Sequence, residues 1–177
     1  MVTCMLYAGE SPKYSVVSLP FILSSPMRTI TCTEIFSCTP QELFDALHTP
    51  SSVRAWWHAD RIIVIPREGG VFTVAWGEHE DDPIHVSSGT YEVFAPPHKI
   101  VMVDLKYYAQ MGPTMPDAPI SITYDISSHS EGAQLKLTHA GFPDDGEGDA
   151  YFEGCVQGWK MSLDSLRSYL ETAKSNP

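Results

Sequence analysis

The sequence predicts an α+β fold in which an antiparallel sheet of about six to seven strands wraps around one long C-terminal helix. The stretch from Asp149 to Glu171 has apolar residues every three to four positions, as one buried face of a helix requires. Much of the segment between residues 61 and 139 alternates apolar and polar residues, as half-buried strands do. Helical and strand patterns do not alternate along the chain, so parallel βαβ units are not expected.

The residues before this region predict one strand and two short helices. Arg28 to Phe36 alternates and is rich in Thr and Ile, which is typical of a strand. A helix follows, with Thr39 as its N-cap, Pro40 at its first position and Glu42 completing a capping box. Ser51 to Trp57 predicts a second short helix, capped by its own first residue or by the threonine two positions earlier.

Six further segments are expected as strands. In the fourth of them, alternation places Val103, Leu105 and Tyr107 on the buried face. A curved sheet around a single helix closes at its rims but often not at its middle, which favours a cavity between the two. The segments are Arg61–Ile65, Phe72–Trp76, Gly89–Val93, Val101–Tyr107, Ile120–Ile126 and Leu135–His139.

Length, charge and cysteine content limit the organisation and the partners. A chain of 177 residues is expected to hold one domain, at residues 27–177, after an N-terminal appendage of unknown role at residues 1–26. The net charge of −11 argues against nucleic acid as a partner, and no apolar run is long enough for membrane insertion. The four cysteines have no metal-site spacing, which favours reduced thiols and a cytoplasmic location.

The candidate site is the space between sheet and helix. Alternation and helical spacing direct mostly aromatic side chains toward it, some with polar tips, as in pockets that orient a mostly apolar ligand. A filled core is the alternative for most of these positions. No catalytic residue, metal site or cofactor is expected. The predicted cavity-lining, ligand-binding residues are Trp57, Phe72, Trp76, Tyr91, Val103, Tyr107, Tyr124, His139, Phe142, Phe152 and Trp159.

His139 has two interpretations. It follows Leu135 and Leu137 on the apolar face of the last predicted strand. Its reference pKa near neutrality suits a polar contact or an acid–base group at the mouth of the cavity. The other interpretation is a buried histidine that donates a hydrogen bond to a backbone carbonyl of the Gly141–Pro143 turn.

Two acidic stretches could be mistaken for metal sites. Residues 79–85 hold two histidines and three acids without the fixed spacing of ligands, so we expect a solvated hairpin loop. Residues 144–149 lack the spacing of a calcium loop and are expected to place negative charge at the positive N-terminus of the long helix.

Two glycines are unusual inside the long predicted helix. Gly154 and Gly158 each cost about 1 kcal/mol relative to alanine, and their helical angle places them off the main apolar stripe. We expect a close neighbour at this surface: residues 1–26, a second subunit, or simply an adjoining loop.

Five motifs, in order, resemble those of a known family, the homologues of the activator of heat-shock-protein-90 ATPase, within the START-like, birch-pollen-allergen-like helix-grip superfamily. The resemblance covers about residues 29 to 172. It implies a helix-grip fold that binds a small hydrophobic or amphipathic molecule between sheet and helix, without catalysis. The motifs are Trp56-Trp57, Pro66-Arg67-Glu68-Gly69-Gly70-Val71-Phe72, Gly89-x-Tyr91 with Pro96-Pro97-x-x-Ile100, Leu137-Thr138-His139-Ala140-Gly141-Phe142-Pro143, and Gly158-Trp159 with Leu163 and Leu166.

Other functions stay open at this point. A stress-response or co-chaperone role through a surface contact predicts a filled core and an exposed patch; the resemblance to the eukaryotic activators covers only their C-terminal domain. A cyclase- or hydrolase-like enzyme would use His139 with Tyr91 or Tyr124 and predicts convergent polar groups inside the cavity. A homodimer is compatible with the sequence.

Overall fold

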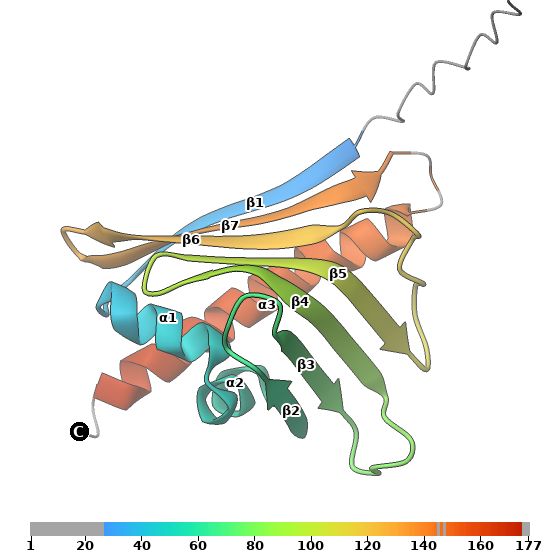
Figure 1. Ribbon diagram of the computed structural model, residues 1–177, viewed down its shortest axis with the longest axis horizontal. Helices are drawn as coiled ribbons and strands as arrows, with labels where there is room; N and C mark the ends of the chain where they lie inside the picture. Colours follow the sequence, from blue (N-terminus) through green and yellow to red (C-terminus); the bar gives the residue numbers. More distant parts are fainter. Residues whose placement is uncertain (1–26, 145, 147, 175–177) are drawn as a thin grey trace, which may run out of the picture.

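The computed structural model describes residues 27–144, 146 and 148–174; the predicted appendage at residues 1–26 lies outside the described residues. The described chain forms seven strands and three helices (Figure 1). In chain order these are β1 (Met27–Phe36), α1 (Pro40–His48), α2 (Pro50–Trp57), β2 (Arg61–Val64), β3 (Val71–Trp76), β4 (His85–Ala95), β5 (Lys99–Ala109), β6 (Ser121–His129), β7 (Gly132–Pro143) and α3 (Asp149–Lys174).

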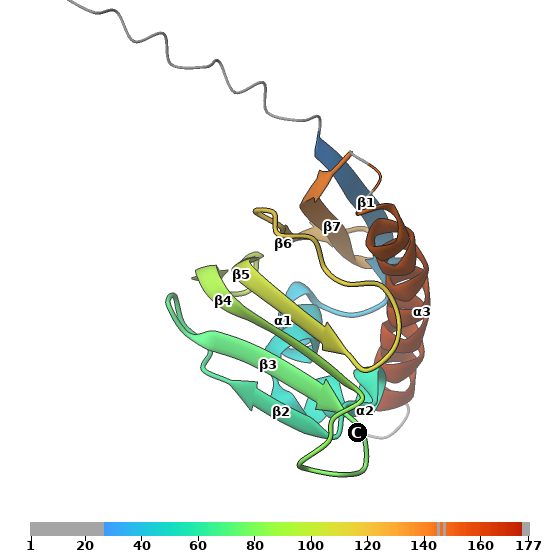
Figure 2. The ribbon, with the colours of Figure 1, turned by 90° about the vertical axis from the view of Figure 1, so that its right-hand side faces the viewer.

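All seven strands lie in one antiparallel sheet with the order β1-β7-β6-β5-β4-β3-β2. The sheet is curved, and α3 runs along its concave side, while α1 and α2 lie beside the C-terminal part of α3 (Figures 1 and 2). The predicted α+β class and the curved sheet around a long C-terminal helix are therefore confirmed.

The two short helices begin at prolines. At α1 the predicted capping box is present: the Thr39 hydroxyl accepts from the Glu42 amide at 3.2 Å, and the Thr39 amide donates to the Glu42 carboxylate at 2.7 Å. α2 begins at Pro50, one residue earlier than predicted. Its N-cap is Thr49, but no side-chain hydrogen bond caps this helix. As in α1, proline at the first position supplies a helical φ and has no amide proton that needs a partner.

The C-terminal half of α3 closes the core. Leu163, Leu166 and Leu170 are at most 8% exposed, and this half of the helix is joined to α2 by hydrogen bonds. The Ser165 hydroxyl donates to the backbone carbonyl of Trp56. Burial of this leucine stripe stabilises each side chain by about 1.5–3 kcal/mol, so the attachment of α3 is strongest in this half.

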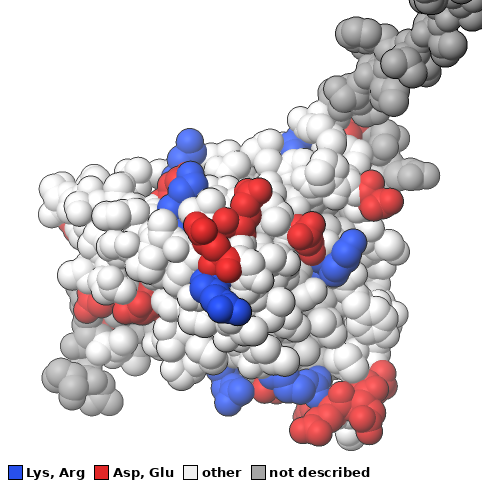
Figure 3. Space-filling view, in the orientation of Figure 1, with Lys and Arg blue, Asp and Glu red and all other residues white. Residues whose placement is uncertain are grey.

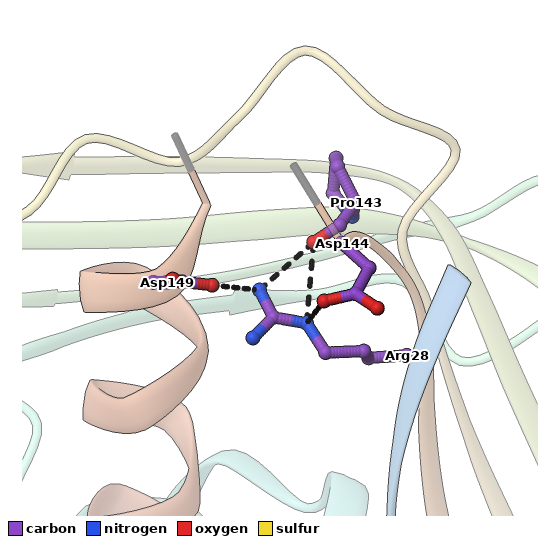
Figure 4. Close-up of polar contacts among 4 residues, drawn as sticks. All are labelled: Arg28, Pro143, Asp144 and Asp149. Atoms are coloured by element: carbon purple, nitrogen blue, oxygen red, sulfur yellow. Dashed lines mark hydrogen bonds and ion pairs between the residues drawn. The ribbon is translucent and has the colours of Figure 1, made fainter. Parts of the chain in front are cut away.

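The edge strand β1 is also fixed to the start of α3. Arg28 donates to the carbonyl oxygen of Pro143 (Nη2···O 2.8 Å) and pairs with Asp149 (Nη2···Oδ1 2.7 Å), while Asp144 lies 3.6 Å from its Nε (Figure 4). The guanidinium carbon is 4.4 Å from the centroid of the Phe152 ring. Asp149 is the first residue of α3 and holds this arginine.

A second arginine makes a similar contact near the other end of β1. From α3, Arg167 donates to the Ile35 carbonyl and to the Glu34 carboxylate, each at 2.7 Å, and its guanidinium lies over the Phe36 ring. Together with Arg28, this contact sets the position of α3 relative to the sheet at two points far apart along the helix.

A bulge in β5 changes which of its residues face α3. Asp104 and Leu105 stand opposite the single residue Gly89 in the register with β4, and Asp104 has a left-handed φ of 52°. A Cβ at Gly89 would lie 2.7 Å from Leu105 Cδ2 and 3.2 Å from the Val103 carbonyl oxygen, so a side chain here would crowd β5. Beyond the bulge, Leu105 and Tyr107 face the helix side as predicted.

The same bulge corrects the prediction for Val103. Strict alternation placed Val103 on the buried face, but the residue that is buried before the bulge is its neighbour Met102, at 5% exposure. A similar irregularity at Glu92 in β4 separates the faces of Tyr91 and Val93. The extra residue in each strand shifts the period of two by one position.

On the face shown in Figure 3 most of the surface is uncharged, with acidic and basic side chains interspersed. Acidic side chains gather at the connection between β3 and β4, at the lower right of Figure 3, where Glu78, Glu80, Asp81 and Asp82 are exposed. This part agrees with the predicted solvated loop, but His85 does not belong to it, because it is the first residue of β4. None of the helices within the described residues is long and apolar enough to cross a membrane.

Candidate functional site: a cavity between the sheet and α3

A cavity of about 550 Å³ lies between the N-terminal half of α3 and the ends of β3, β4 and β5. α3 contributes positions one helical turn apart: Tyr151, Gly154, Cys155, Gly158, Trp159 and Ser162. The opposite wall comes from α2, the strands and the 110–119 segment: Trp57, Trp76, Ile84, His85, Ser87, Leu105, Lys106, Tyr107, Pro113, Met115, Ile122 and His139. The volume is within the usual range for pockets that hold drug-sized molecules.

The cavity has an open end and a buried end. Ile84 is 48% exposed, and Pro113 and Gly158 are also exposed, so these residues mark the mouth. At the inner end, Ile122 and His139 are 9% and 4% exposed. The space therefore leads from solvent into the core beneath α3.

The indoles at the cavity have their N–H groups satisfied within the protein. Trp57 donates to the Ser162 hydroxyl, Trp76 to the backbone carbonyl of Trp57, and Trp159 to Nδ1 of His139, each at 3.0 Å. Because these donors are already used, the rings offer the cavity apolar and aromatic surface rather than free polar groups.

His139 is held as a neutral ring. Burial lowers its pKa to about 4, so the ring carries no charge at neutral pH. The Trp159 indole can only donate, so Nδ1 accepts and the proton of the neutral ring lies on Nε2. This Nε2 is buried and has no hydrogen-bond partner among the described residues. The predicted donation to a carbonyl of the Gly141–Pro143 turn is therefore wrong. Nδ1 of the ring accepts from the Trp159 indole on α3, and Nε2 donates to no described residue.

A second pair of polar groups lies on α3 itself. The Tyr151 hydroxyl interacts with the thiol of Cys155, one turn further along the helix. Burial raises the pKa of Cys155 to about 11 and that of Tyr151 above its ordinary value. Both groups therefore stay protonated and uncharged at neutral pH.

The structure brings together one part of the predicted lining. Trp57, Trp76, Tyr107, His139 and Trp159 surround the cavity. The Trp57 and Trp159 rings are nearly parallel, with centroids 6.4 Å apart. Their role in binding a ligand stays a prediction.

The remaining predicted positions lie elsewhere. Four of them belong to the closed core and do not line the cavity. Phe152 is half-buried at the arginine contact near Arg28, and Val103 lies on the other side of the β5 bulge. The four core residues are Phe72, Tyr91, Tyr124 and Phe142, with exposures of 5%, 1%, 5% and 0%.

Sequence reasoning missed several lining residues. Met115 and Pro113 come from a loop that gives no periodic signal. His85 was assigned to a solvated loop, but its ring stacks on Tyr107 at the mouth, with centroids 6.2 Å apart. Two others follow from periodicity: Tyr151 lies two turns before Trp159 on the same stripe of the predicted helix, and Leu105 lies on the predicted buried face of its strand.

The glycines of α3 face the cavity mouth. A Cβ at Gly154 would have Pro113 Cγ as its nearest neighbour, at 3.9 Å, and one at Gly158 would meet nothing within 4 Å of the described atoms. The expectation of a close neighbour is thus met only by a distant loop contact. Of the other two neighbours considered, residues 1–26 lie outside the described residues, and a second subunit stays a prediction.

A curved antiparallel sheet that wraps a long C-terminal helix, with a cavity under the helix, defines the class: a START-like helix-grip protein. The sequence matches the family model described as activator of Hsp90 ATPase homolog 1-like protein over residues 37–171. The chain belongs to this family. No curated protein matches the sequence.

Solved structures with this fold are similar over most of the chain. A protein from Mesorhizobium loti is 17% identical, with a TM-score of 0.66, and covers 82% of this chain and 98% of its own. A protein of unknown function from Staphylococcus aureus is 13% identical, with a TM-score of 0.67 and coverages of 86% and 98%. The Aha1 dimer from Colwellia psychrerythraea is 15% identical, with a TM-score of 0.64 and coverages of 81% and 96%. These likenesses establish the fold.

Proposed function

We propose that the protein binds a small hydrophobic or amphipathic molecule in the cavity between the sheet and α3. The observation that carries this proposal is the cavity itself, about 550 Å³ in volume and open to solvent at one end. A filled core, which a purely surface-acting protein would have, is not what the described residues form at this position.

The chemistry of the wall supports an apolar ligand with flat surfaces. Trp57, Trp76 and Trp159 have their indole donors occupied, so they present ring surface. Of the ionisable residues in the wall, His139 and Cys155 are uncharged at neutral pH, and Lys106 is exposed to solvent. Transfer of an apolar molecule from water to such a wall is favourable by about 25 cal/mol per Å² of buried apolar area.

Binding is favoured over catalysis by the positions of the candidate acid–base groups. His139 already accepts from Trp159 on one nitrogen, and its other nitrogen is not exposed to the cavity. Tyr91 and Tyr124, the partners considered for an enzyme, lie in the closed core, and burial raises the pKa of both. A general acid or base must reach the proton that it transfers, and neither tyrosine lines the cavity.

The proposal is tested by native mass spectrometry of the purified protein, followed by extraction of any molecule that is retained. Met115→Trp fills the space next to the cavity mouth, whereas Met111→Trp adds the same ring at an 85% exposed position of the same loop. We expect a retained or added hydrophobic compound to bind the wild type and Met111→Trp, and to bind Met115→Trp at least about tenfold more weakly. A protein that retains no compound and is not shifted by a hydrophobic library contradicts the proposal.

A protein contact is a second candidate, favoured by a separate observation. On the edge strand β2 and its neighbours, Ile63 is 62% exposed, Ile65 43% and Val71 38%. An exposed apolar edge strand is a site for pairing with another chain, and a second copy or a chaperone would both fit such a surface. Light scattering separates these outcomes: a dimer that becomes a monomer in Ile63→Lys supports self-association, and a monomer in both proteins removes it.

The cysteines favour a reducing compartment. Cys32 and Cys155 are free thiols within the part of the chain that the structure describes. We propose a cytoplasmic location on this basis, since secreted domains of this size commonly pair their cysteines. Fractionation of cells that express the full chain tests it.

A further inference from the structure

The sheet is only partly paired between β5 and β6. β6 pairs with β5 along Lys99–Met102 alone, although β5 continues to Ala109 and is paired with β4 up to that residue. Beyond Met102 the two strands diverge (Figures 1 and 2), and no backbone hydrogen bond from a described residue reaches this side of residues 103–109. In an antiparallel sheet every second residue directs its N–H and C=O toward the same neighbour. This part of β5 therefore has an open edge with uncommitted donors and acceptors.

The cavity reaches this open edge. Its wall includes three consecutive residues of β5, which are Leu105, Lys106 and Tyr107. Successive side chains of a strand point to opposite faces, so a cavity on one face borders all three residues only where it also borders the edge of the strand. The backbone of β5 is therefore part of the cavity wall. A strand edge offers N–H donors and C=O acceptors side by side, without charge.

Two side-chain hydroxyls lie next to this edge. Ser87 stands opposite Tyr107 in the register of β4 with β5, so both side chains lie on the face that the cavity occupies. No hydrogen bond within the described part of the chain uses either hydroxyl. From α3, the ring of Tyr151 has its centroid 5.5 Å from that of Tyr107, but the Tyr151 hydroxyl is already used by Cys155. Ser87 and Tyr107 therefore place free hydroxyls beside the open edge.

The surroundings disfavour a charged ligand. None of the described residues that line the cavity is acidic, so a cationic group finds no carboxylate there. An anionic group is disfavoured as well, because Lys106 lies by alternation on the opposite face of β5 from Tyr107. Burial raises the pKa of Tyr107 and of Cys155, which means that this wall opposes negative charge. An ionised head group would lose its hydration here, so we expect the polar part of the ligand to be neutral.

We infer that the ligand is uncharged and carries a secondary amide beside its apolar part, and that the open edge of β5 binds this amide. The inference rests on the proposed binding function and names the class of molecule that the cavity takes. A secondary amide has one donor and one acceptor, so it pairs with the backbone of residues 103–109 as a neighbouring strand would. Tyr107 and Ser87 supply a further donor for the amide oxygen. An ester can only accept, so it leaves a backbone carbonyl without a partner.

The inference is tested with three decanoyl compounds: N-methyldecanamide, methyl decanoate and decanoate. They differ only in the head group, which is an amide, an ester without the donor, or an anion. Equilibrium dialysis measures their dissociation constants for the wild type and Tyr107→Phe. Tyr108→Phe is the matched control, because Tyr108 is 51% exposed and follows Tyr107 on the other face of β5. Met115→Trp shows whether binding takes place in the cavity, and a capped peptide of three apolar residues distinguishes a peptide from a small amide.

We expect N-methyldecanamide to bind the wild type at least about fivefold more tightly than methyl decanoate or decanoate. Tyr107→Phe weakens binding of the amide about fivefold, Met115→Trp weakens binding of all three compounds, and Tyr108→Phe changes none. If the capped peptide binds more tightly than N-methyldecanamide, a peptide is the source of the amide, and weaker binding identifies a small amide.

Amide hydrogen exchange of the wild type locates the bound amide without any substitution. With N-methyldecanamide bound, at least one backbone N–H among residues 103–109 exchanges at least about tenfold more slowly, because its open side gains an acceptor. The outer edge of β2, at residues 61–64, is the internal control and exchanges as in the free protein. This measurement decides the location if Tyr107→Phe does not fold.

Other outcomes overturn the inference in distinguishable ways. If the amide and the ester bind the wild type equally well, or if decanoate binds most tightly, the amide class is wrong, although the binding function stands. If the amide binds and exchange at residues 103–109 is unchanged, the open edge of β5 is not its site. A retained compound that is charged or lacks an amide also overturns the inference. If the wild type binds no compound and retains none, the proposed function fails and this inference fails with it.

Discussion

The indole Nε1 of Trp159 donates a 3.0 Å hydrogen bond to Nδ1 of His139, joining α3 to β7 at the inner end of the cavity. This contact fixes three properties at once. It orients the Trp159 ring along the wall, it selects the tautomer of the histidine, and it ties the N-terminal half of α3 to the sheet.

The first prediction concerns this hydrogen bond. His139→Leu leaves the buried indole N–H without an acceptor, which lowers the free energy of unfolding by about 1–3 kcal/mol. The measurement is urea denaturation followed by circular dichroism. In a Trp159→Phe background the same substitution costs about 1 kcal/mol less, because the donor is already gone. Equal costs in the two backgrounds rule out the coupling.

The second prediction is a pH dependence of stability. Burial lowers the folded-state pKa of His139 to about 4, below its usual value near 6.5. Between these values the unfolded chain binds a proton at His139 that the folded chain excludes. The free energy of unfolding is therefore highest above about pH 6.5 and falls as the pH drops toward 4. The contribution of this one residue is on the order of 3 kcal/mol.

The measurement compares wild type with His139→Gln in urea denaturation at pH 7, 6, 5 and 4. The carboxylates titrate alike in both proteins, so the difference isolates the histidine. The wild type loses more stability than the variant across this range. Parallel curves are incompatible with a buried, neutral His139.

The third prediction concerns the contact between β1 and the start of α3. Arg28 is partly exposed, so Arg28→Ala lowers the free energy of unfolding by only about 1–2 kcal/mol. Its local effect is larger: amide hydrogen exchange in the first two turns of α3 becomes faster, because the fork of hydrogen bonds to Pro143 and Asp149 is lost. Arg28→Lys gives an intermediate result. Arg67→Ala, at an exposed turn, leaves this exchange unchanged.

The fourth prediction concerns the β5 bulge. Gly89→Ala places a methyl group 2.7 Å from Leu105 Cδ2, which destabilises the fold by about 1–3 kcal/mol through overpacking. Leu105→Ala removes the clashing atom, so the double variant is less destabilised than the sum of the two single variants. Thermal unfolding of the four proteins measures this, and strict additivity would argue against the close approach of the two strands.

The fold was largely predictable from local patterns, because alternation and helical spacing are properties of short segments. The capping box at Thr39 and the leucine stripe of α3 follow directly from their spacing. The errors occur where a strand gains a residue. No pattern in the sequence predicts the bulge at Asp104, so strict alternation places Val103 on the wrong face.

The site was less predictable than the fold. Periodicity predicts the direction in which a side chain points, but not whether packed atoms or an open cavity lie in front of it. Tyr124 and Trp159 both point inward, yet the first is sealed in the core and the second lines the cavity. Whether a position borders a void depends on the distance between α3 and each strand, which the curvature of the whole sheet sets.

The sequence by itself determined the class of fold, the order of its elements and the apolar, aromatic character of its interior. These follow from the period of the hydrophobic residues, since each element must bury its own apolar face. Only the tertiary structure decided where the interior stays open. Two arginines and a leucine stripe hold α3 to its partners at separate points, and between them the curved sheet draws away from the N-terminal half of the helix. Long-range contacts of this kind have no signature within any one segment of the chain.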